Sequence, residues 1–230
     1  MFEELLCANL LDLSKTLAAP LFESVRYPFE VLPLLKEFII SLIPALDPED
    51  YVQSGDGVYI SKSAVVAASA CIDGPCIIGA GVQIRHCAFL RGSAIVGENA
   101  VIGNSVEIKN SVIFTGAQVP HFNYVGDSIL GHRAHFGAGV ITSNVKSDKS
   151  RVRVTVNGQS LETGLRKFGA VAGDFAEIGC NTVLNPGTVI GRNANVYPLS
   201  AVRGFVPSNS IYKKAGEVVE KLRIKNSRNI

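Results

Sequence analysis

The sequence contains no tryptophan, and its aromatic residues amount to only 7% of the chain. An excess of charge of one sign is also missing, because the formal net charge is +2. A protein that binds nucleic acid needs basic residues clustered on one face. This composition therefore argues against a nucleic-acid partner.

Paired cysteine motifs and targeting segments are absent as well. The five cysteines are an odd number without a CxxC pair, which fits a reducing compartment better than a disulfide framework. Glu3 and Glu4 stand where a secretory signal would be basic. The apolar run 38–46 is too short to span a bilayer and contains Pro44. We expect a soluble cytoplasmic protein with no membrane partner.

A six-residue repeat dominates the middle of the chain. Neither an α-helix nor a single strand has this period, whereas a short strand followed by a corner does. Such hexads predict a mainly β fold, a solenoid whose coils stack roughly 4.8 Å apart. A small residue lies four positions after most repeat positions, and Cys76 is one of these, so we expect it to be buried. The repeat positions are Ile60, Val66, Ile72, Ile78, Ile84, Leu90, Val96, Ile102, Ile108 and Phe114.

The segments outside the repeat predict three parts. Residues 1–50 have leucines at helical spacing and are expected to be a helical cap or oligomer contact, because the end of a solenoid exposes unpaired strand edges. The solenoid itself is expected over 55–207. Residues 208–230 are expected to form a basic C-terminal helix and tail.

The repeat is interrupted twice. From Phe114 to Leu130 the step is sixteen residues, which is not a multiple of six and predicts a loop at 119–124. A second excursion over 145–167 contains alternating valines and an Asn157-Gly158 pair, which predict a hairpin beside the coils. Loops that project from a rigid scaffold often carry sites.

Three residues suggest chemistry. His121 lies in the first interruption, where an exposed imidazole could accept a proton from an attacking amine. Arg91 and Lys109 are eighteen residues apart, so they should stack on adjacent coils if three hexads close one coil. Two cations roughly 5 Å apart repel each other, and a sugar phosphate between them would relieve the repulsion. A solvated surface position remains open for both.

The motifs around these residues resemble a known family. They are similar to the acetyltransferase domain of the bifunctional N-acetylglucosamine-1-phosphate uridyltransferase/glucosamine-1-phosphate acetyltransferase, and to archaeal sugar-1-phosphate nucleotidylyltransferases with a fused acetyltransferase domain. The resemblance covers roughly 58–144 and 168–205. The motifs are 102–109 (IGNSVEIK), His121, 124–127 (YVGD), 136–144 (FGAGVITSN), 178–181 (IGCN) and 190–191 (IG).

The resemblance implies a left-handed β-helix that assembles as a homotrimer with sites between subunits. The implied reaction is transfer of an acetyl group from acetyl-CoA to an amino-sugar 1-phosphate, and it needs no metal. The family's metal belongs to its nucleotidyl domain, and residues 1–50 are too short for such a domain and lack a Gly-rich phosphate loop after a strand. The implied catalytic residues are His121 and Asn144. Substrate-binding residues would be Arg91, Lys109, Tyr124 and His135, and acetyl-CoA would contact Ala138, Cys180 and Pro198.

Four positions depart from the family pattern. The family has Asn at His135, Tyr at Val145, Ser at Cys180 and Ala at Pro198. These changes gather on the acyl-donor and amine side. The excursion 145–167 has no unambiguous counterpart of a family lysine, and Lys146 and Lys149 are the candidates. A non-catalytic sugar-phosphate-binding, sugar-nucleotide-binding or scaffold protein therefore stays open as an alternative.

A metal-dependent solenoid enzyme is the second alternative. His86, His121, His132 and His135 could be ligands, and His86 and His121 have the spacing of zinc-binding carbonic anhydrases of the same fold. The third ligand expected there is Gly126 in this sequence, which disfavours this alternative.

Overall fold

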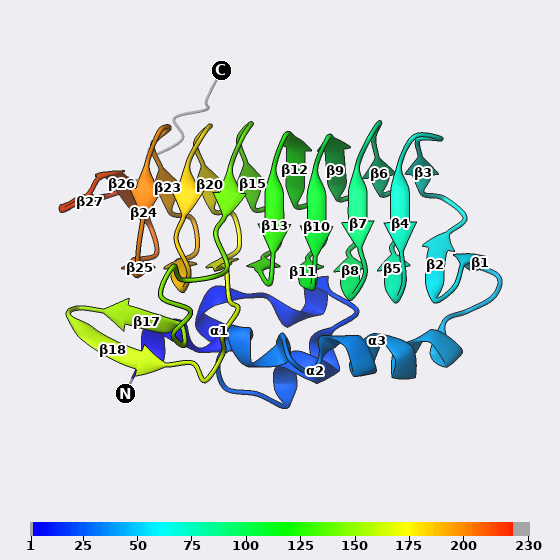
Figure 1. The fold of residues 1–230 in the computed structure, drawn as a ribbon, viewed down its shortest axis with the longest axis horizontal. Helices are drawn as coiled ribbons and strands as arrows, with labels where there is room; N and C mark the ends of the chain where they lie inside the picture. The colour runs from blue at the N-terminus through cyan, green and yellow to red at the C-terminus, as the bar shows by residue number, and fades with distance from the viewer. Residues whose placement is uncertain (1, 223–230) are drawn as a thin grey trace, which may run out of the picture.

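The computed structural model describes residues 2–222 and shows a left-handed solenoid with three parallel β-sheets as its faces (Figure 1). The chain passes through sheets A, B and C in turn in each coil, which confirms the expected mainly β, left-handed β-helix. Sheet A has the order β1 (Tyr51–Gly55), β2 (Val58–Ser61), β5 (Cys76–Ile78), β8 (Ala94–Val96), β11 (Ser111–Ile113), β14 (Ile129–Leu130), β19 (Ala170–Ala172), β22 (Thr188–Ile190) and β25 (Phe205–Val206).

The other two faces follow the same stacking. Sheet B has the order β27 (Glu217–Glu220), β26 (Ser210–Lys214), β23 (Asn195–Val196), β20 (Glu177–Ile178), β15 (His135–Phe136), β12 (Gln118–His121), β9 (Val101–Asn104), β6 (Gln83–Ile84) and β3 (Val65–Val66). Sheet C has the order β24 (Ala201–Val202), β21 (Val183–Leu184), β16 (Ile141–Thr142), β13 (Tyr124–Gly126), β10 (Glu107–Lys109), β7 (Phe89–Arg91) and β4 (Cys71–Asp73).

The repeat positions form the core of the prism, as predicted, up to Ile108. Ile78, Ile84 and Leu90 are buried in one coil, and the next coil repeats the pattern. Cys76 is fully buried at its small-residue position, and burial raises the pKa of its thiol to about 12. Large and small inward side chains alternate because each coil contributes one of each to every face.

The prediction that Phe114 occupies a core position of the solenoid is wrong, because Ile113, one residue earlier, occupies it. Val96 pairs with Ile113, and Ile113 pairs with Leu130, so two successive coils are one residue shorter than the repeat. Ile113 therefore enters the core, and Phe114 points outward from sheet A, where its ring meets that of Phe22 at 5.4 Å. The shortening occurs at the corners between sheets C and A.

The segment 119–124 is consequently not a loop excursion. Val119 and Val125 are both buried core residues, and the segment is divided between β12, a corner and β13. The apparent break in the repeat came from the shortened corners on either side. In those corners Asn110 and Asp127 adopt left-handed backbone conformations, with φ of 45° and 48°.

The N-terminal segment lies along the outer side of sheet A and not over an end of the solenoid (Figure 1). Its apolar residues pack with outward-facing residues of sheet A in a second core, so the expected end cap is not what this segment forms. Its elements are η1 (Glu3–Leu5), α1 (Cys7–Leu10), η2 (Leu13–Lys15), α2 (Ala19–Glu23), η3 (Pro28–Val31), α3 (Leu35–Leu42) and η4 (Ile43–Ala45), where η denotes a 3₁₀ helix.

The excursion after β16 contains the predicted hairpin. Strands β17 (Arg153–Val156) and β18 (Gln159–Glu162) pair antiparallel around Asn157 and Gly158, which both have positive φ. The inward valines of β17 join the second core. Gly187 lets the hairpin approach closely, because a Cβ there would lie 2.3 Å from the backbone oxygen of Arg153.

The predicted C-terminal helix is wrong over the described residues. Tyr212 continues the repeat into the core, and β26 pairs in parallel with β23. Gly216, with a φ of 78°, then reverses the chain into β27, which pairs antiparallel with β26. Residues 223–230 of the expected helix and tail lie outside the described residues. No helix within 2–222 is both long enough and apolar enough to cross a membrane.

Candidate functional site

Two of the predicted site residues, Lys109 and Asn144, contact a buried carboxylate, that of Asp127. Its side chain is 5% exposed, and it accepts hydrogen bonds from Lys109 (3.2 Å), Asn110 (2.8 Å) and Asn144 (2.5 Å). Asn144 Nδ2 also donates to the Tyr124 hydroxyl at 3.2 Å. The Asp127 carboxylate therefore joins Lys109 to Asn144, and the Asn144 amide joins both to Tyr124.

Tyr124 lies over Gly126, because a Cβ at Gly126 would be only 2.4 Å from the Tyr124 hydroxyl. Burial, and next the charge of Asp127, raise the pKa of the Tyr124 phenol above its ordinary value. The phenol therefore stays protonated at neutral pH. Since its oxygen accepts from Asn144, its own proton is free to be donated to a ligand.

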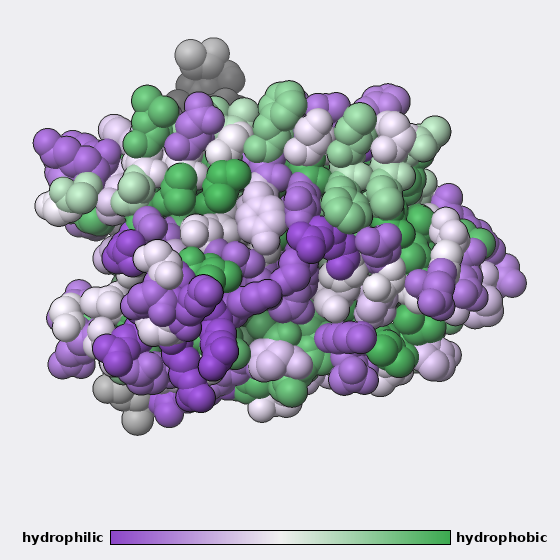
Figure 2. All heavy atoms as spheres, viewed as in Figure 1, coloured by the Kyte–Doolittle hydropathy of each residue, from purple (hydrophilic) through white to green (hydrophobic). Residues whose placement is uncertain are grey.

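Arg91 and Lys109 occupy equivalent positions on neighbouring coils, because the residues before them, Leu90 and Ile108, are paired. Each cation has its own carboxylate. Arg91 Nη1 lies 2.7 Å from Glu107 Oε1, and Lys109 contacts Asp127. The repulsion expected between the two cations is thus offset within the chain. Figure 2 shows hydrophilic side chains along the lower part of this face, above the helical layer.

His121 lies elsewhere, at the corner between sheets B and C. Its side chain is exposed, and its backbone N–H donates to Asn123 Oδ1 at 3.1 Å. Lys109 is at the opposite end of the short sheet C strands. Within residues 2–222 no hydrogen bond or ion pair joins His121 to Arg91 or Lys109. One chain by itself therefore does not assemble the predicted base with the predicted phosphate ligands.

The same corner carries the residues predicted to contact acetyl-CoA. Gly139 N–H donates to the His121 oxygen (3.0 Å) and Asn181 N–H to the Ala138 oxygen (2.8 Å). Leu199 N–H donates to the Cys180 oxygen (2.9 Å), which places Pro198 on the next coil. The corners that hold His121, Ala138, Cys180 and Pro198 thus stack in a continuous row.

A groove of about 320 Å³ runs beside this row on the outer side of sheet B. His135, Cys180 and Pro198 all line it, so three of the predicted ligand-binding residues share one surface. The imidazole of His135 is held by Glu177, with 2.9 Å between Nδ1 and Oε2. The departures from the family pattern at these three positions are therefore neighbours in space.

The four histidines do not form a metal site. Asn104 pairs with His121 and its side chain donates to the His86 oxygen, so Asn104 separates the two histidines along the corner row. The His132 imidazole contacts the Thr115 oxygen near sheet A, away from His135 on sheet B. Within residues 2–222 no three His, Cys, Asp or Glu side chains gather in a way that could hold a metal ion.

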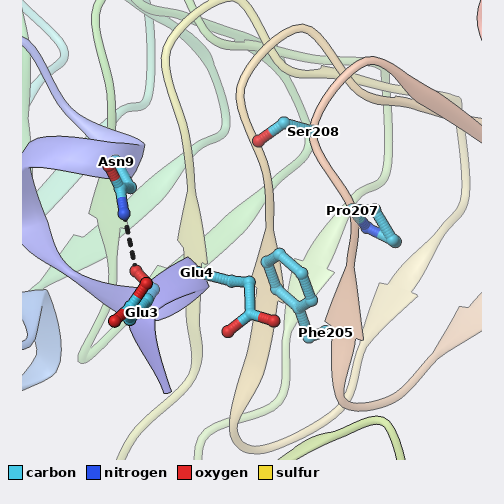
Figure 3. A pocket seen from close by; sticks show the side chains of 6 residues that line it. All are labelled: Glu3, Glu4, Asn9, Phe205, Pro207 and Ser208. Atoms are coloured by element: carbon cyan, nitrogen blue, oxygen red, sulfur yellow. Dashed lines mark hydrogen bonds between the residues drawn. The ribbon is translucent and has the colours of Figure 1, made fainter. Parts of the chain in front are cut away.

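A hollow of about 570 Å³ lies between the N-terminal segment and the last coils. Figure 3 shows the Glu4 and Phe205 side chains next to each other in it, with the Asn9 amide bonded to the Glu3 backbone oxygen at 2.7 Å. None of the predicted site residues lines this hollow.

The sequence interpretation missed Glu107, Asn110 and Asp127. Glu107 and Asp127 belong to the two motifs quoted for the resemblance, but no spacing rule singled them out. The spacing of Asn110 and Asp127 in the sequence is a signal that could have identified them. Asn110 and Asp127 are seventeen residues apart, the length of a shortened coil, so they stack at one corner, where Asn110 Nδ2 bonds Asp127 Oδ1.

Curated proteins with similar sequences bear out the resemblance over just under half of the chain. A bifunctional sugar-1-phosphate nucleotidylyltransferase/acetyltransferase of Sulfurisphaera tokodaii is 38% identical over 101 residues, 44% of this chain and 25% of that protein. The bifunctional protein GlmU of Methanocaldococcus jannaschii is 34% identical over 112 residues, 48% of this chain and 27% of that protein. This chain thus spans about a quarter of these relatives. No family model matches.

Solved structures with a similar fold include a hexapeptide transferase family protein of Anaplasma phagocytophilum. It is 19% identical, with a TM-score of 0.41 over 72% of this chain and 81% of that one. UDP-N-acetylglucosamine O-acyltransferase of Moraxella catarrhalis is 19% identical, with a TM-score of 0.42 over 71% and 72%. These scores are below 0.5, and the likeness has no bearing on the site.

Proposed function

We propose that the chain is an N-acetyltransferase that transfers an acetyl group from acetyl-CoA to the amine of an amino-sugar 1-phosphate. The observation that carries the proposal is the row of stacked corners from His121 to Pro198. It provides an exposed imidazole at one end and a groove for a long, extended co-substrate beside the other. The match to curated nucleotidylyltransferase/acetyltransferase sequences supports the same reaction class.

His121 is the proposed general base. It removes a proton from the sugar amine while the amine nitrogen attacks the thioester carbonyl, so that a C–N bond forms and the C–S bond breaks. The proton then passes to the departing CoA thiolate. The N–H of Ala138, which has no hydrogen-bond partner within residues 2–222, is a candidate donor to the oxyanion.

Arg91, Lys109 and Tyr124 are the proposed ligands of the sugar phosphate. Arg91 lies at a half-exposed position, and Lys109 keeps a quarter of its side chain exposed. A phosphate would share these cations with Glu107 and Asp127. Because His121 is on a different edge of sheet C, we propose that the complete site forms between subunits of a homotrimer. Exposed apolar residues next to the corner row, Phe122 (63%) and Leu199 (80%), support a subunit contact there.

The deciding experiment measures CoA thiol release by the purified chain with acetyl-CoA and a panel of amino-sugar 1-phosphates. We expect turnover with at least one of them, and a loss of about 10²- to 10⁴-fold in His121→Ala with unchanged circular dichroism. Light scattering should give a mass of three times 24.5 kDa. Sugar-phosphate binding without thiol release would favour the non-catalytic alternative, and full activity of His121→Ala would remove His121 from the mechanism.

A further inference from the structure

We propose that Asp127 is a positioning residue that fixes the Asn144 side-chain amide so that its carbonyl oxygen faces the acceptor amine. This inference rests on the proposed function, because it assigns a task to Asn144 in that reaction. The orientation of the Asn144 amide can also be tested without turnover.

The position of Asp127 follows from the shortened corners. Removing one residue from two successive coils stacks Asn110 directly beside Asp127, and left-handed φ values at both residues turn their side chains toward each other. The backbone on either side is fixed as well. Asp127 N–H donates to the Lys109 oxygen, and Gly169 N–H donates to the Asp127 oxygen, both at 2.9 Å. The backbone of Asp127 is therefore held on both sides, and its carboxylate is buried.

The chemistry of the contacts determines which way the Asn144 amide points. An ionised carboxylate can only accept hydrogen bonds, so the group of Asn144 that faces Asp127 must be its NH₂. The second hydrogen of this NH₂ is directed to the Tyr124 hydroxyl. Both donors are used, and Oδ1 has no hydrogen-bond partner within residues 2–222. Asn144 therefore presents an acceptor.

An acceptor is what an attacking amine requires. An amine nitrogen must direct its lone pair at the thioester carbon, and an oxygen that accepts one of its N–H groups fixes that direction. A flipped amide would place its own NH₂ against the amine, donor against donor. With an asparagine in place of Asp127, the neighbouring group can accept or donate, so both orientations of Asn144 become available.

The test uses the full chain with the substrate pair found active above. Loss of a charge-assisted hydrogen bond is expected to lower kcat of Asp127→Asn by about 10- to 100-fold. The KM for acetyl-CoA should stay unchanged. Asp174→Asn is the matched control, because Asp174 is an equally buried carboxylate at another corner. It should leave kcat and both KM values unchanged.

The exchanged pair Asp127→Asn/Asn144→Asp keeps one carboxylate and one amide in contact. Multiplying the two single-variant reductions in kcat gives the kcat expected without coupling. We expect the kcat of the double variant to be about tenfold or more above that value. If Asp127→Asn does not fold, the double variant is compared with Asn144→Asp alone, and a kcat no higher than that of Asn144→Asp would overturn the proposal. Strictly multiplicative effects, or wild-type kcat in folded Asp127→Asn, would overturn the proposal.

A second readout separates this inference from the proposed function. The Asn144 side-chain NH₂ protons, assigned by NMR with Asn144→Ala, should exchange with solvent about tenfold or more slowly in the wild type than in Asp127→Asn. Slow exchange in a chain without turnover would support the orientation of Asn144 while removing the reaction. Equal exchange in both proteins would overturn the orientation itself.

Discussion

Asp127 and Asp174 are both buried carboxylates at corners of the same solenoid, but they have different partners. Asp174 accepts from the backbone N–H groups of Asp12 (2.7 Å) and His132 (2.8 Å), and from Arg192 (3.1 Å). Asp127 accepts from three side chains instead, those of Lys109, Asn110 and Asn144. The same chemical group therefore holds backbone segments at one corner and side chains at the other.

Under the proposed function, this difference assigns stability to one corner and ligand contact to the other. Backbone donors fix the path of the chain, so Asp174 attaches the N-terminal segment to the solenoid on the side that is covered. Side-chain donors fix groups that can also contact a ligand, so Asp127 organises the open side. Burial alone does not distinguish the two roles, whereas the nature of the donors does.

The largest effect is expected from Lys109→Met. This change leaves the buried Asp127 carboxylate without its cation and with only two side-chain amide donors, those of Asn110 and Asn144, which are less firmly fixed than backbone donors. Breaking a buried charged pair typically costs up to about 3–5 kcal/mol of unfolding free energy. Activity should fall at the same time, through a higher KM for the sugar phosphate. Urea denaturation and the thiol-release assay would measure both, with the exposed Lys62→Met as control. Unchanged stability would mean that Asp127 does not depend on Lys109.

A smaller effect is expected from Arg192→Met at the other corner. Asp174 keeps its two backbone donors, so we expect a loss of about 1–3 kcal/mol in unfolding free energy and no change in kcat or KM. Amide hydrogen exchange should become faster around Asp12, where the N-terminal segment is attached. A change in the kinetic constants would contradict the division between the two corners.

The pH dependence of stability gives a finer test of Asp174. Burial raises the pKa of its carboxyl above the ordinary 3.8, and this outweighs the hydrogen bonds and the Arg192 charge, which act in the opposite direction. The folded state then binds the proton more tightly than the unfolded state. The contribution of Asp174 to stability must fall as pH rises through the region above 3.8. The stability difference between wild type and Asp174→Asn should shrink from pH 4 to pH 7, and a growing difference would refute this.

Arg91→Gln should have the smallest effect on stability. Arg91 and Glu107 form an ion pair at the surface, and such pairs contribute little. We expect no measurable shift in Tm but a KM for the sugar phosphate about tenfold higher, because a charged hydrogen bond to the ligand is lost. A shift in Tm with unchanged KM would show that Arg91 contributes to stability and not to binding of the sugar phosphate.

The sequence allowed the solenoid to be predicted because its repeat is a direct consequence of the stacking. It did not locate the shortened corners, since Ile113 and Phe114 are both apolar and either could occupy the core position. The stacking of Arg91 on Lys109 followed from the coil length. Their carboxylate partners did not, because side-chain pairing depends on the exact register at each corner.

The two ends of the chain were misjudged for a different reason. The leucines of residues 1–50 indicate an apolar helical surface but contain no information about which surface of the solenoid it covers. At the C-terminus, the lysines at 213 and 214 resemble the charged side of a helix, although Tyr212 continues the repeat. A single buried aromatic residue was too weak a signal beside so many charges.

The antiparallel strands at the two ends of the prism affect how molecules can associate. A stack of parallel coils can in principle grow without limit, since each terminal edge offers hydrogen-bonding groups to another chain. Here β1 reverses direction on sheet A at the first coil, and β27 does so on sheet B at the last. Each occupies the terminal edge of one of the three sheets, so a further coil stacked on either end could not continue all three sheets at once.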